Sequence, residues 1–195
     1  MADLADQVAS ILNLAAVRIR PLSGGCIGDV SRVDLSDGRS VVAKSAGPRG
    51  TLDIEGWMLT YLAERSDLPV PRVLHSSPSL LLMEHIEGES VFSTDAECHA
   101  ADLLAALHAL TAPHFGLERD TLIGSLQQVN TPRTSWVDFF REHRLLAMAR
   151  QAADAGRLER PLHDRIRRLA DALPSLIDEP DQPSLIHGDV WTTNV

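Results

Sequence analysis

Three short runs of β-branched and apolar residues near the start of the chain place the strongest constraint on its fold. The runs cover residues 17–22, 30–35 and 40–45. Ser36-Asp37-Gly38, a sequence typical of hairpin turns, separates the last two runs, and a Gly-rich stretch, residues 23–28, separates the first two. Because connections this short join antiparallel neighbours, the pattern predicts an antiparallel meander of three strands.

Helical periodicity dominates the rest of the chain. Apolar residues recur at helical spacing over five ranges: 2–13, 51–65, 94–110, 135–155 and 159–173. Two further strands are expected, an apolar run at Leu80–Met83 and a short one at 184–186, and a connection of about twenty residues, 115–134, is typical of functional or mobile loops.

Strands followed by helices predict an α+β fold in two lobes. The N-lobe, residues 1–84, would hold the antiparallel sheet and the helix over residues 51–65. The C-lobe, residues 85–195, would be mostly helical.

The charge balance restricts the partners of the protein. There are 27 Asp and Glu against 18 Lys and Arg, a formal net charge of −9, which disfavours a broad surface for nucleic acid or anionic membranes. No apolar run approaches the roughly 18 residues that span a bilayer, and the acidic start lacks a targeting pattern. Cys26 and Cys98 lack metal-ligand spacing and are expected to be free thiols. We therefore expect a soluble cytoplasmic protein.

A single lysine stands out among the cationic residues. The chain has 17 arginines and one lysine, Lys44, which follows the apolar run Val41–Ala43. A GC-rich genome explains the arginines, and Lys44 could be a chance surface residue. However, Glu55 lies on the apolar stripe of the following helix, where a carboxylate needs a cation. A Gly-rich turn, a strand lysine and a helix glutamate occur in this order in kinase N-lobes, which predicts that Lys44 binds phosphates and Glu55 holds Lys44.

The segment His187-Gly188-Asp189-Val190-Trp191-Thr192-Thr193-Asn194 carries the most specific signal. An Asp followed five positions later by an Asn is the spacing of a phosphotransferase catalytic loop, in which the Asp accepts the proton of the attacking hydroxyl and the Asn binds Mg²⁺. Two other readings exist. His187 and Asp189 could both be metal ligands. Alternatively, His187 could be a hydrogen-bonded core histidine, and Asp189 could cap a helix. The other histidines form no cluster that would complete a metal site.

The strand at Leu80–Met83 runs directly into Glu84-His85-Ile86. At this position between two lobes, backbone groups of Glu84 and Ile86 could hydrogen-bond the edge of an adenine. The alternative is a plain buried strand.

Motifs over nearly the whole chain are shared with one family. They are Ser23-Gly24-Gly25-Cys26-Ile27, Lys44, Glu55, Leu107-His108, Phe115-Gly116, Ile123-Gly124, Gln128, Asn130, Trp136 to Phe140, Arg144-Leu145, and His187 to Trp191 with Asn194. With these motifs the chain resembles the fructosamine (ketosamine-3) kinase family, within the aminoglycoside phosphotransferase and protein-kinase-like folds. The resemblance implies ATP- and Mg²⁺-dependent phosphorylation of the 3-hydroxyl of a small or protein-bound ketosamine, a deglycation repair activity.

The resemblance also implies roles for individual residues. Asp189 would be the catalytic base and Asn194 a Mg²⁺ ligand. Nucleotide-binding candidates are Gly24, Gly25, Lys44, Glu55, Glu84 and Ile86, and candidates near the acceptor are Gln128, Asn130 and Trp191. Cys26 lies where the family often carries Cys or Ser, so it is either a redox-sensitive thiol that closes the ATP site or an inert loop cysteine.

One departure concerns the end of the chain. The superfamily places a second metal-binding Asp on the hairpin after the catalytic loop, whereas this sequence ends at Val195. We therefore expect the sequence to be C-terminally truncated, with Mg²⁺ short of one carboxylate in this form. Two alternatives stay open, a kinase for aminoglycosides, choline or another hydroxylated amine, and a non-catalytic nucleotide-binding module. The oligomeric state is open as well.

Overall fold

The computed structural model describes residues 3–22, 29–88 and 93–190. The chain divides into two compact units, one of residues 1–106 with 189–195 and the other of residues 107–188. These units are defined by the packing of the chain. The division predicted from the sequence, an N-lobe of residues 1–84 and a C-lobe of residues 85–195, stays a prediction.

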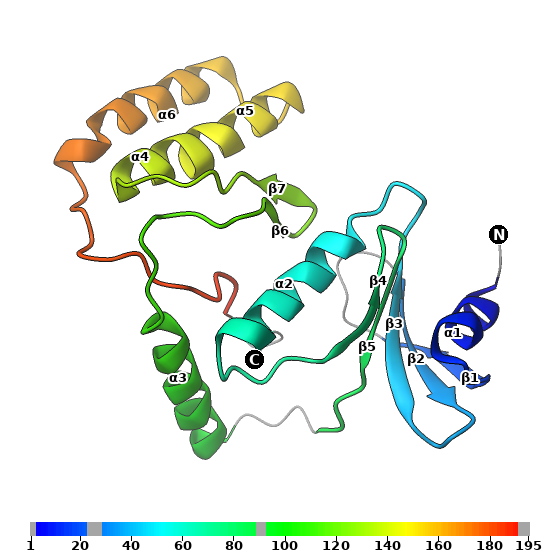
Figure 1. Cartoon of the computed structure of the whole chain (residues 1–195). Helices are drawn as coiled ribbons and strands as arrows, with labels where there is room; N and C mark the ends of the chain where they lie inside the picture. Colours follow the sequence, from blue (N-terminus) through cyan, green and yellow to red (C-terminus); the bar gives the residue numbers. More distant parts are fainter. Residues whose placement is uncertain (1–2, 23–28, 89–92, 191–195) are drawn as a thin grey trace. The chain divides into compact units, whose positions relative to one another are not determined.

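The first unit is built on a five-stranded antiparallel sheet in the order β1-β2-β3-β5-β4 (Figure 1). The strands are β1 (Ala16–Pro21), β2 (Asp29–Leu35), β3 (Ser40–Ser45), β4 (Val73–Ser76) and β5 (Leu80–Glu84). The predicted meander and the predicted strand at Leu80–Met83 are confirmed. No sequence pattern predicted β4, a short edge strand in a proline-punctuated stretch.

The β2–β3 turn forms at the predicted Ser36-Asp37-Gly38. Gly38 has a φ of +87°, in the left-handed region that glycine adopts without strain. The N–H of Leu35 donates to the carbonyl of Arg39 at 2.8 Å, and the Asp37 carboxylate accepts the N–H of Arg39 at 3.0 Å. These bonds close the turn, and with it they fix the register that sets Lys44 opposite Val30.

Helix α1 (Leu4–Leu12) covers one face of the sheet (Figure 1). It begins after Asp3, whose carboxylate accepts the N–H of Leu4 at 2.7 Å. Its Val8 packs in the main core with Val33, Ala43 and Leu82, all fully buried. Burying each of the valine and leucine side chains contributes about 1.5–3 kcal/mol, so this face anchors the sheet.

Helix α2 (Leu52–Arg65) lies on the opposite face of the sheet (Figure 1). Side chains alternate along β3, so that Ala43 faces α1 and Lys44 faces α2. Gly56 is the point of close approach, because a Cβ at this position would meet the Ser76 side chain and lie 3.1 Å from Cδ1 of Leu81. The absence of a side chain at Gly56 therefore brings α2 down onto β4 and β5.

The next elements of the chain are helix α3 (Thr94–His108) and a hairpin of β6 (Thr121–Ile123) and β7 (Leu126–Gln128). A helical run follows, made of α4 (Trp136–Phe140), a π-helical turn (Arg141–Leu145) and α5 (Leu146–Asp154), and then α6 (Arg160–Ala172) and a short 3₁₀ turn (Leu173–Ser175). The three predicted helices of this region are present, and the 115–134 connection contains the β6–β7 hairpin.

The predicted strand at 184–186 is wrong. Only a single antiparallel bridge forms there, between Thr111 and Ser184, with the N–H of Leu185 donating to the carbonyl of Leu110 at 2.9 Å. Among the described helices, none is long and apolar enough to cross a membrane.

Gly56→Ala tests the close packing of α2. The added methyl group has to displace Ser76, whose Cβ lies 2.8 Å from the Cβ position of residue 56, so we expect the free energy of unfolding to fall by about 1–3 kcal/mol. Urea denaturation measures this loss. Gly47→Ala is the matched control, since a Cβ there meets nothing within 4 Å. Equal stability of the two variants would show that α2 has room to move.

Candidate active site

Lys44 and Glu55 form an ion pair on the α2 face of the sheet. The Nζ of Lys44 donates to both carboxylate oxygens of Glu55, at 2.9 Å and 2.7 Å. The Lys44 side chain is 15% exposed and that of Glu55 is 34% exposed, so the pair is partly shielded from water. Charge-assisted hydrogen bonds to both oxygens fix the ammonium at one place above the strand. The predicted contact is therefore present, and its role in phosphate binding stays a prediction.

Lys44 has defined neighbours across the sheet. It pairs with Val30 on β2 and with Leu81 on β5, and Val42, two residues earlier on β3, lies on the same face. The ammonium therefore lies over an apolar part of the sheet.

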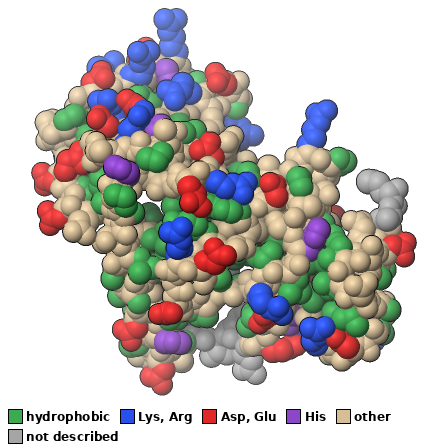
Figure 2. Space-filling model, in the orientation of Figure 1, with side chains coloured by type: hydrophobic (Ala, Val, Ile, Leu, Met, Phe, Trp, Pro, Cys, Tyr) green, Lys and Arg blue, Asp and Glu red, His purple; other side chains and the backbone are tan. Residues whose placement is uncertain are grey.

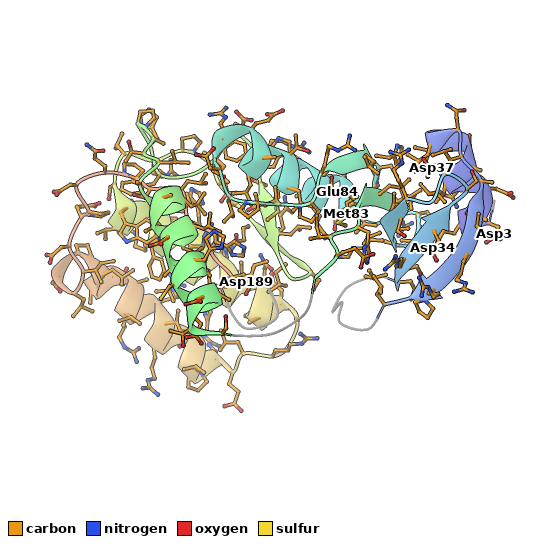
Figure 3. All side chains as sticks on the ribbon, turned by 90° about the horizontal axis from the view of Figure 1, so that it is seen from below. Asp3, Asp34, Asp37, Met83, Glu84 and Asp189 are labelled. Atoms are coloured by element: carbon orange, nitrogen blue, oxygen red, sulfur yellow. The ribbon has the colours of Figure 1, made fainter. Side chains whose placement is uncertain are left out.

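Glu84 and Ile86 lie where β5 ends, and Figure 3 labels Glu84. The N–H of Glu84 donates to the carbonyl of Arg72 at 2.9 Å, so this donor belongs to the sheet. Any adenine contact by Glu84 would therefore use its carbonyl oxygen. Ile86 is 57% exposed, beyond the last residue of the strand. Their predicted contact with adenine stays a prediction.

Asp189, which is labelled in Figure 3, is exposed and follows a glycine in an unusual conformation. Gly188 has a φ of +82°, in the left-handed region, and this is the physical reason for a glycine between His187 and Asp189. By packing, Asp189 belongs to the same compact unit as Lys44 and Glu55. The structure thus assigns three of the predicted catalytic and phosphate-binding residues to one unit.

Several predicted site residues lie outside the described residues. They are Gly24, Gly25, Cys26, Trp191 and Asn194. Their predicted roles stay predictions. Cys98, the cysteine in the described part of the chain, is a free and exposed thiol. Within the described ranges, no three His, Cys, Asp or Glu side chains are grouped so that they could hold a metal ion.

Asn130 is the centre of a buried polar network. It is 2% exposed, and its Nδ2 donates to the carbonyl of Arg119 at 3.0 Å and to Oγ1 of Thr121 at 2.8 Å. Its Oδ1 accepts from Nη2 of Arg144 at 2.6 Å. Both amide hydrogens and the amide oxygen thus have partners within the chain. This geometry favours a role for Asn130 in positioning the loop, whereas its predicted place near the acceptor is untested.

Gln128, the other predicted acceptor residue of this loop, is half-buried at the end of β7. Its Oε1 accepts from Oγ1 of Thr121 at 3.4 Å, a long and weak bond. Of the two amides, Gln128 is therefore the one whose side chain is freer to bind a ligand.

Arg144 also belongs to this network. The sequence marked it only as part of the Arg144-Leu145 motif and did not indicate this role. Arg144 lies in the π-helical turn, donates through Nη1 to the carbonyl of Val129 at 2.7 Å, and stacks on Phe139 with 4.7 Å between Cζ and the ring centroid. Burial lowers the pKa of Arg144. Its acceptors are therefore essential to keep the guanidinium charge inside the protein.

The neighbouring His143 is also shielded from water. Burial, followed by the nearby Arg133 charge, lowers its pKa, and its Nε2 is buried without a hydrogen-bond partner in the described part of the chain. Its ring meets that of Phe139 edge-on, with centroids 5.3 Å apart. A neutral imidazole packed on an aromatic ring is the state that these surroundings favour.

The same helical run begins at a well-defined cap. Ser135 accepts the N–H of Asp138 at 3.0 Å, and Glu179 accepts the N–H of Trp136 at 2.6 Å. The hydroxyl of Ser135 donates to Glu179, and this bond is the main cause of the lowered pKa of that carboxyl. The cap orients Trp136, which lies 5.6 Å from Phe115, measured between ring centroids.

Asn130→Ala separates positioning from acceptor binding. The variant leaves the half-buried Arg144 guanidinium without one acceptor, so we expect the free energy of unfolding to fall by about 2–3 kcal/mol. Urea denaturation measures the change. Gln127→Ala is the control: its exposed amide donates to Asp120, and we expect a change below about 0.5 kcal/mol. Unchanged stability in Asn130→Ala with weakened acceptor binding would instead assign the amide to the acceptor.

Comparison with known proteins places the chain in a family. Residues 3–195 match the sequence profile described as Fructosamine kinase. The chain belongs to the fructosamine kinase family. The predicted family is thereby confirmed.

Two of the curated relatives show how much of the chain is shared. The chain is 30% identical over 190 residues to the chloroplastic protein-ribulosamine 3-kinase of Arabidopsis thaliana, covering 91% of this chain and 56% of the relative. It is 34% identical over 187 residues to a probable ketoamine kinase of Synechocystis, covering 90% of this chain and 60% of the relative. The chain thus spans little more than half the length of these curated relatives.

Solved structures share the fold. A Thermobifida fusca protein named as a fructosamine-3-kinase is 28% identical with a TM-score of 0.81, over 97% of this chain and 67% of that one. An aminoglycoside phosphotransferase, crystallised with AMP-PNP and hygromycin B, is 16% identical with a TM-score of 0.55, over 90% of this chain and 60% of that one. The predicted kinase-like α+β fold is confirmed.

Proposed function

We propose that the protein is an ATP-dependent phosphotransferase that acts on a hydroxyl of ketosamines, either small or protein-bound. The observation that carries the proposal is the Lys44–Glu55 pair. A cation held at one place above the sheet can bind the phosphates of a nucleoside triphosphate. The names of the Arabidopsis and Synechocystis relatives support ketosamines as the acceptor class.

In the proposed reaction each residue has a defined task. Lys44 binds the α- and β-phosphates of ATP, and Glu55 keeps its ammonium in place. The carboxylate of Asp189 accepts the proton of the acceptor hydroxyl while the hydroxyl oxygen bonds to the γ-phosphorus. The bond from that phosphorus to the bridging oxygen breaks, and ADP leaves. Asn194 and a further carboxylate would hold Mg²⁺, which neutralises phosphate charge.

The product chemistry suggests a biological role. Phosphorylation of the 3-hydroxyl of a ketosamine destabilises the adduct and frees the amine, so the activity would repair glycated amines in the cytoplasm. The acidic balance of the chain, −9, suits an acceptor that carries a cationic amine. Acidic and basic side chains are intermixed on the face shown in Figure 2, so selectivity would come from the local site.

An acceptor of the aminoglycoside type is the second candidate. The observation that favours it is the fold shared with an aminoglycoside phosphotransferase, which was crystallised with AMP-PNP and with hygromycin B, a hydroxylated amine. Both candidates use the same nucleotide chemistry, and they differ only in the acceptor.

The first experiment measures ADP formation from Mg·ATP with ribulosamine, fructosamine or hygromycin B as acceptor. It uses the 195-residue chain and the longest chain encoded by the same gene. We expect ketosamine-dependent ADP formation that Asp189→Asn abolishes. Turnover with hygromycin B alone would favour the second candidate. Binding of ATP without turnover of any acceptor would favour a non-catalytic nucleotide-binding module.

Glu55→Gln tests whether the ion pair orients Lys44 for catalysis. The neutral amide holds the ammonium less firmly, and since a misplacement of about 1 Å can cost about 100-fold, we expect kcat to fall by about 10- to 100-fold. Steady-state kinetics with varied ATP gives the value. Glu64→Gln, which removes an exposed carboxylate near the end of the same helix, should leave kcat unchanged. Equal rates in both variants would contradict the orienting role of Glu55.

A further inference from the structure

Arg32 connects the sheet to the segment that follows β5. It lies on β2, and its Nη2 forms an ion pair with Oε1 of Glu87 at 2.9 Å, while its Nη1 lies 3.5 Å from Nε2 of His85. Glu87 and His85 flank Ile86, the residue predicted to contact adenine. One guanidinium therefore contacts the residues on both sides of Ile86, although it lies 53 residues away from His85 in the sequence.

The guanidinium is itself held from the sheet. Its Nε donates to Oδ1 of Asp34 at 3.0 Å, and its Nη2 donates to Oγ of Ser40 at 3.0 Å. Ser40 in turn donates to Asp34 at 2.9 Å, and this bond is the main cause of the lowered pKa of Asp34. The guanidinium group of Arg32 is planar, and acceptors on β2 and β3 fix one side of it. Its remaining N–H groups therefore point in one direction. Figure 3 labels Asp34 on β2.

Arg32 lies on the face of the sheet that carries Lys44. In the β2–β3 register Val30 is opposite Lys44 and Arg32 is opposite Val42, so the two β2 residues are on one face and two positions apart. Lys44 marks the phosphate end of the proposed nucleotide site, and Arg32 marks the end toward the segment after β5. Arg32 is thus placed to act on the adenine end.

The segment has little else to hold it among the described contacts. The Glu87 side chain is 74% exposed, and Nδ1 of His85, though only 3.4 Å from Oε1 of Glu87, is buried without a well-aligned hydrogen bond in the described residues. An exposed segment without fixed contacts loses conformational entropy when a ligand orders it. A contact that orders the segment beforehand removes that cost.

We infer that Arg32 is a positioning residue for the nucleotide. By holding His85 and Glu87 it fixes the backbone of Ile86 in the orientation that adenine binding needs, without itself contacting the reacting atoms. The inference rests on the proposed function, and it adds a specificity determinant for the purine base that the sequence motifs did not indicate.

Arg32→Met in the longest chain encoded by the gene tests the inference. We expect the KM for ATP and the Kd for Mg·AMP-PNP, measured by calorimetry, to rise by up to about tenfold, because the variant loses both the ion pair with Glu87 and the contact with His85. We expect kcat and the KM for the ketosamine to stay within about twofold of the wild-type values, because the variant does not change the reacting groups. We also expect the preference for ATP over GTP to fall, because a less ordered segment after β5 discriminates less well between the hydrogen-bonding edges of adenine and guanine.

Arg20→Met is the matched control. Arg20 lies on the neighbouring strand and donates to the same Asp34 carboxylate at 3.0 Å, and the hydrogen bonds described for it do not reach His85 or Glu87. We expect its nucleotide affinity to match that of the wild type. An equal loss in Arg20→Met would show that the whole charge cluster, and not the contact with the segment, matters, and would overturn the inference.

Glu87→Gln keeps the test decisive if Arg32→Met is poorly folded. The residue is exposed, so the fold should tolerate the change, and we expect a smaller rise in the Kd for Mg·AMP-PNP in the same direction. Unchanged affinity in both Arg32→Met and Glu87→Gln would overturn the inference while the proposed function stands. Wild-type protein that binds no Mg·AMP-PNP would overturn both.

Discussion

The ion pair between Lys44 and Glu55 is the interaction on which the rest of the proposed site depends. Its partners come from a strand and a helix, 11 residues apart, and both oxygens of the carboxylate accept from one ammonium. Such a pair forms only if the helix lies close to the sheet, and Gly56 supplies that closeness, since a side chain there would collide with Ser76. Helix α1 anchors the opposite face through Val8. The apolar core therefore sets the position of a polar pair, and the pair in turn defines the phosphate end of the proposed nucleotide site.

Two arginines, one in each compact unit, organise the polar structure around them in the same physical way. Arg32, in the first unit, is held by acceptors on the sheet and holds the segment after β5. Arg144, in the second unit, is held in the π-helical turn and connects that turn to Asn130 and the loop before it. Each guanidinium offers several donors in a fixed plane, so one side chain can tie together segments that share no backbone hydrogen bonds. Fixed contacts of this kind reduce the conformational entropy that a ligand would have to remove.

Local pattern was enough to predict much of the fold. Alternation and turn residues predicted the β2–β3 hairpin, where Gly38 adopts the left-handed conformation that its position requires. An apolar strand ending in a lysine, followed by a glutamate on the apolar stripe of a helix, predicted the Lys44–Glu55 contact. Strand β4, in contrast, has four residues at the edge of the sheet, too few for a periodic signal, and it forms because β5 offers it hydrogen bonds. The expected strand near Leu185 failed for the converse reason, since only one bridge partner is available there.

The sequence by itself determined the family, the α+β class, the β2–β3 hairpin, the helices and the candidate residues for phosphoryl transfer, because these depend on local spacing and on motifs. Only the tertiary structure decided which polar side chains are already occupied. The sequence predicted that Asn130 lies near the acceptor, which stays a prediction, and the structure shows that its amide hydrogens and oxygen bond to Arg119, Thr121 and Arg144. Arg32 looked like an ordinary strand residue. Hydrogen-bond partners that lie 9 to 53 residues apart leave no trace in a local pattern, because chain folding alone brings them within bonding distance.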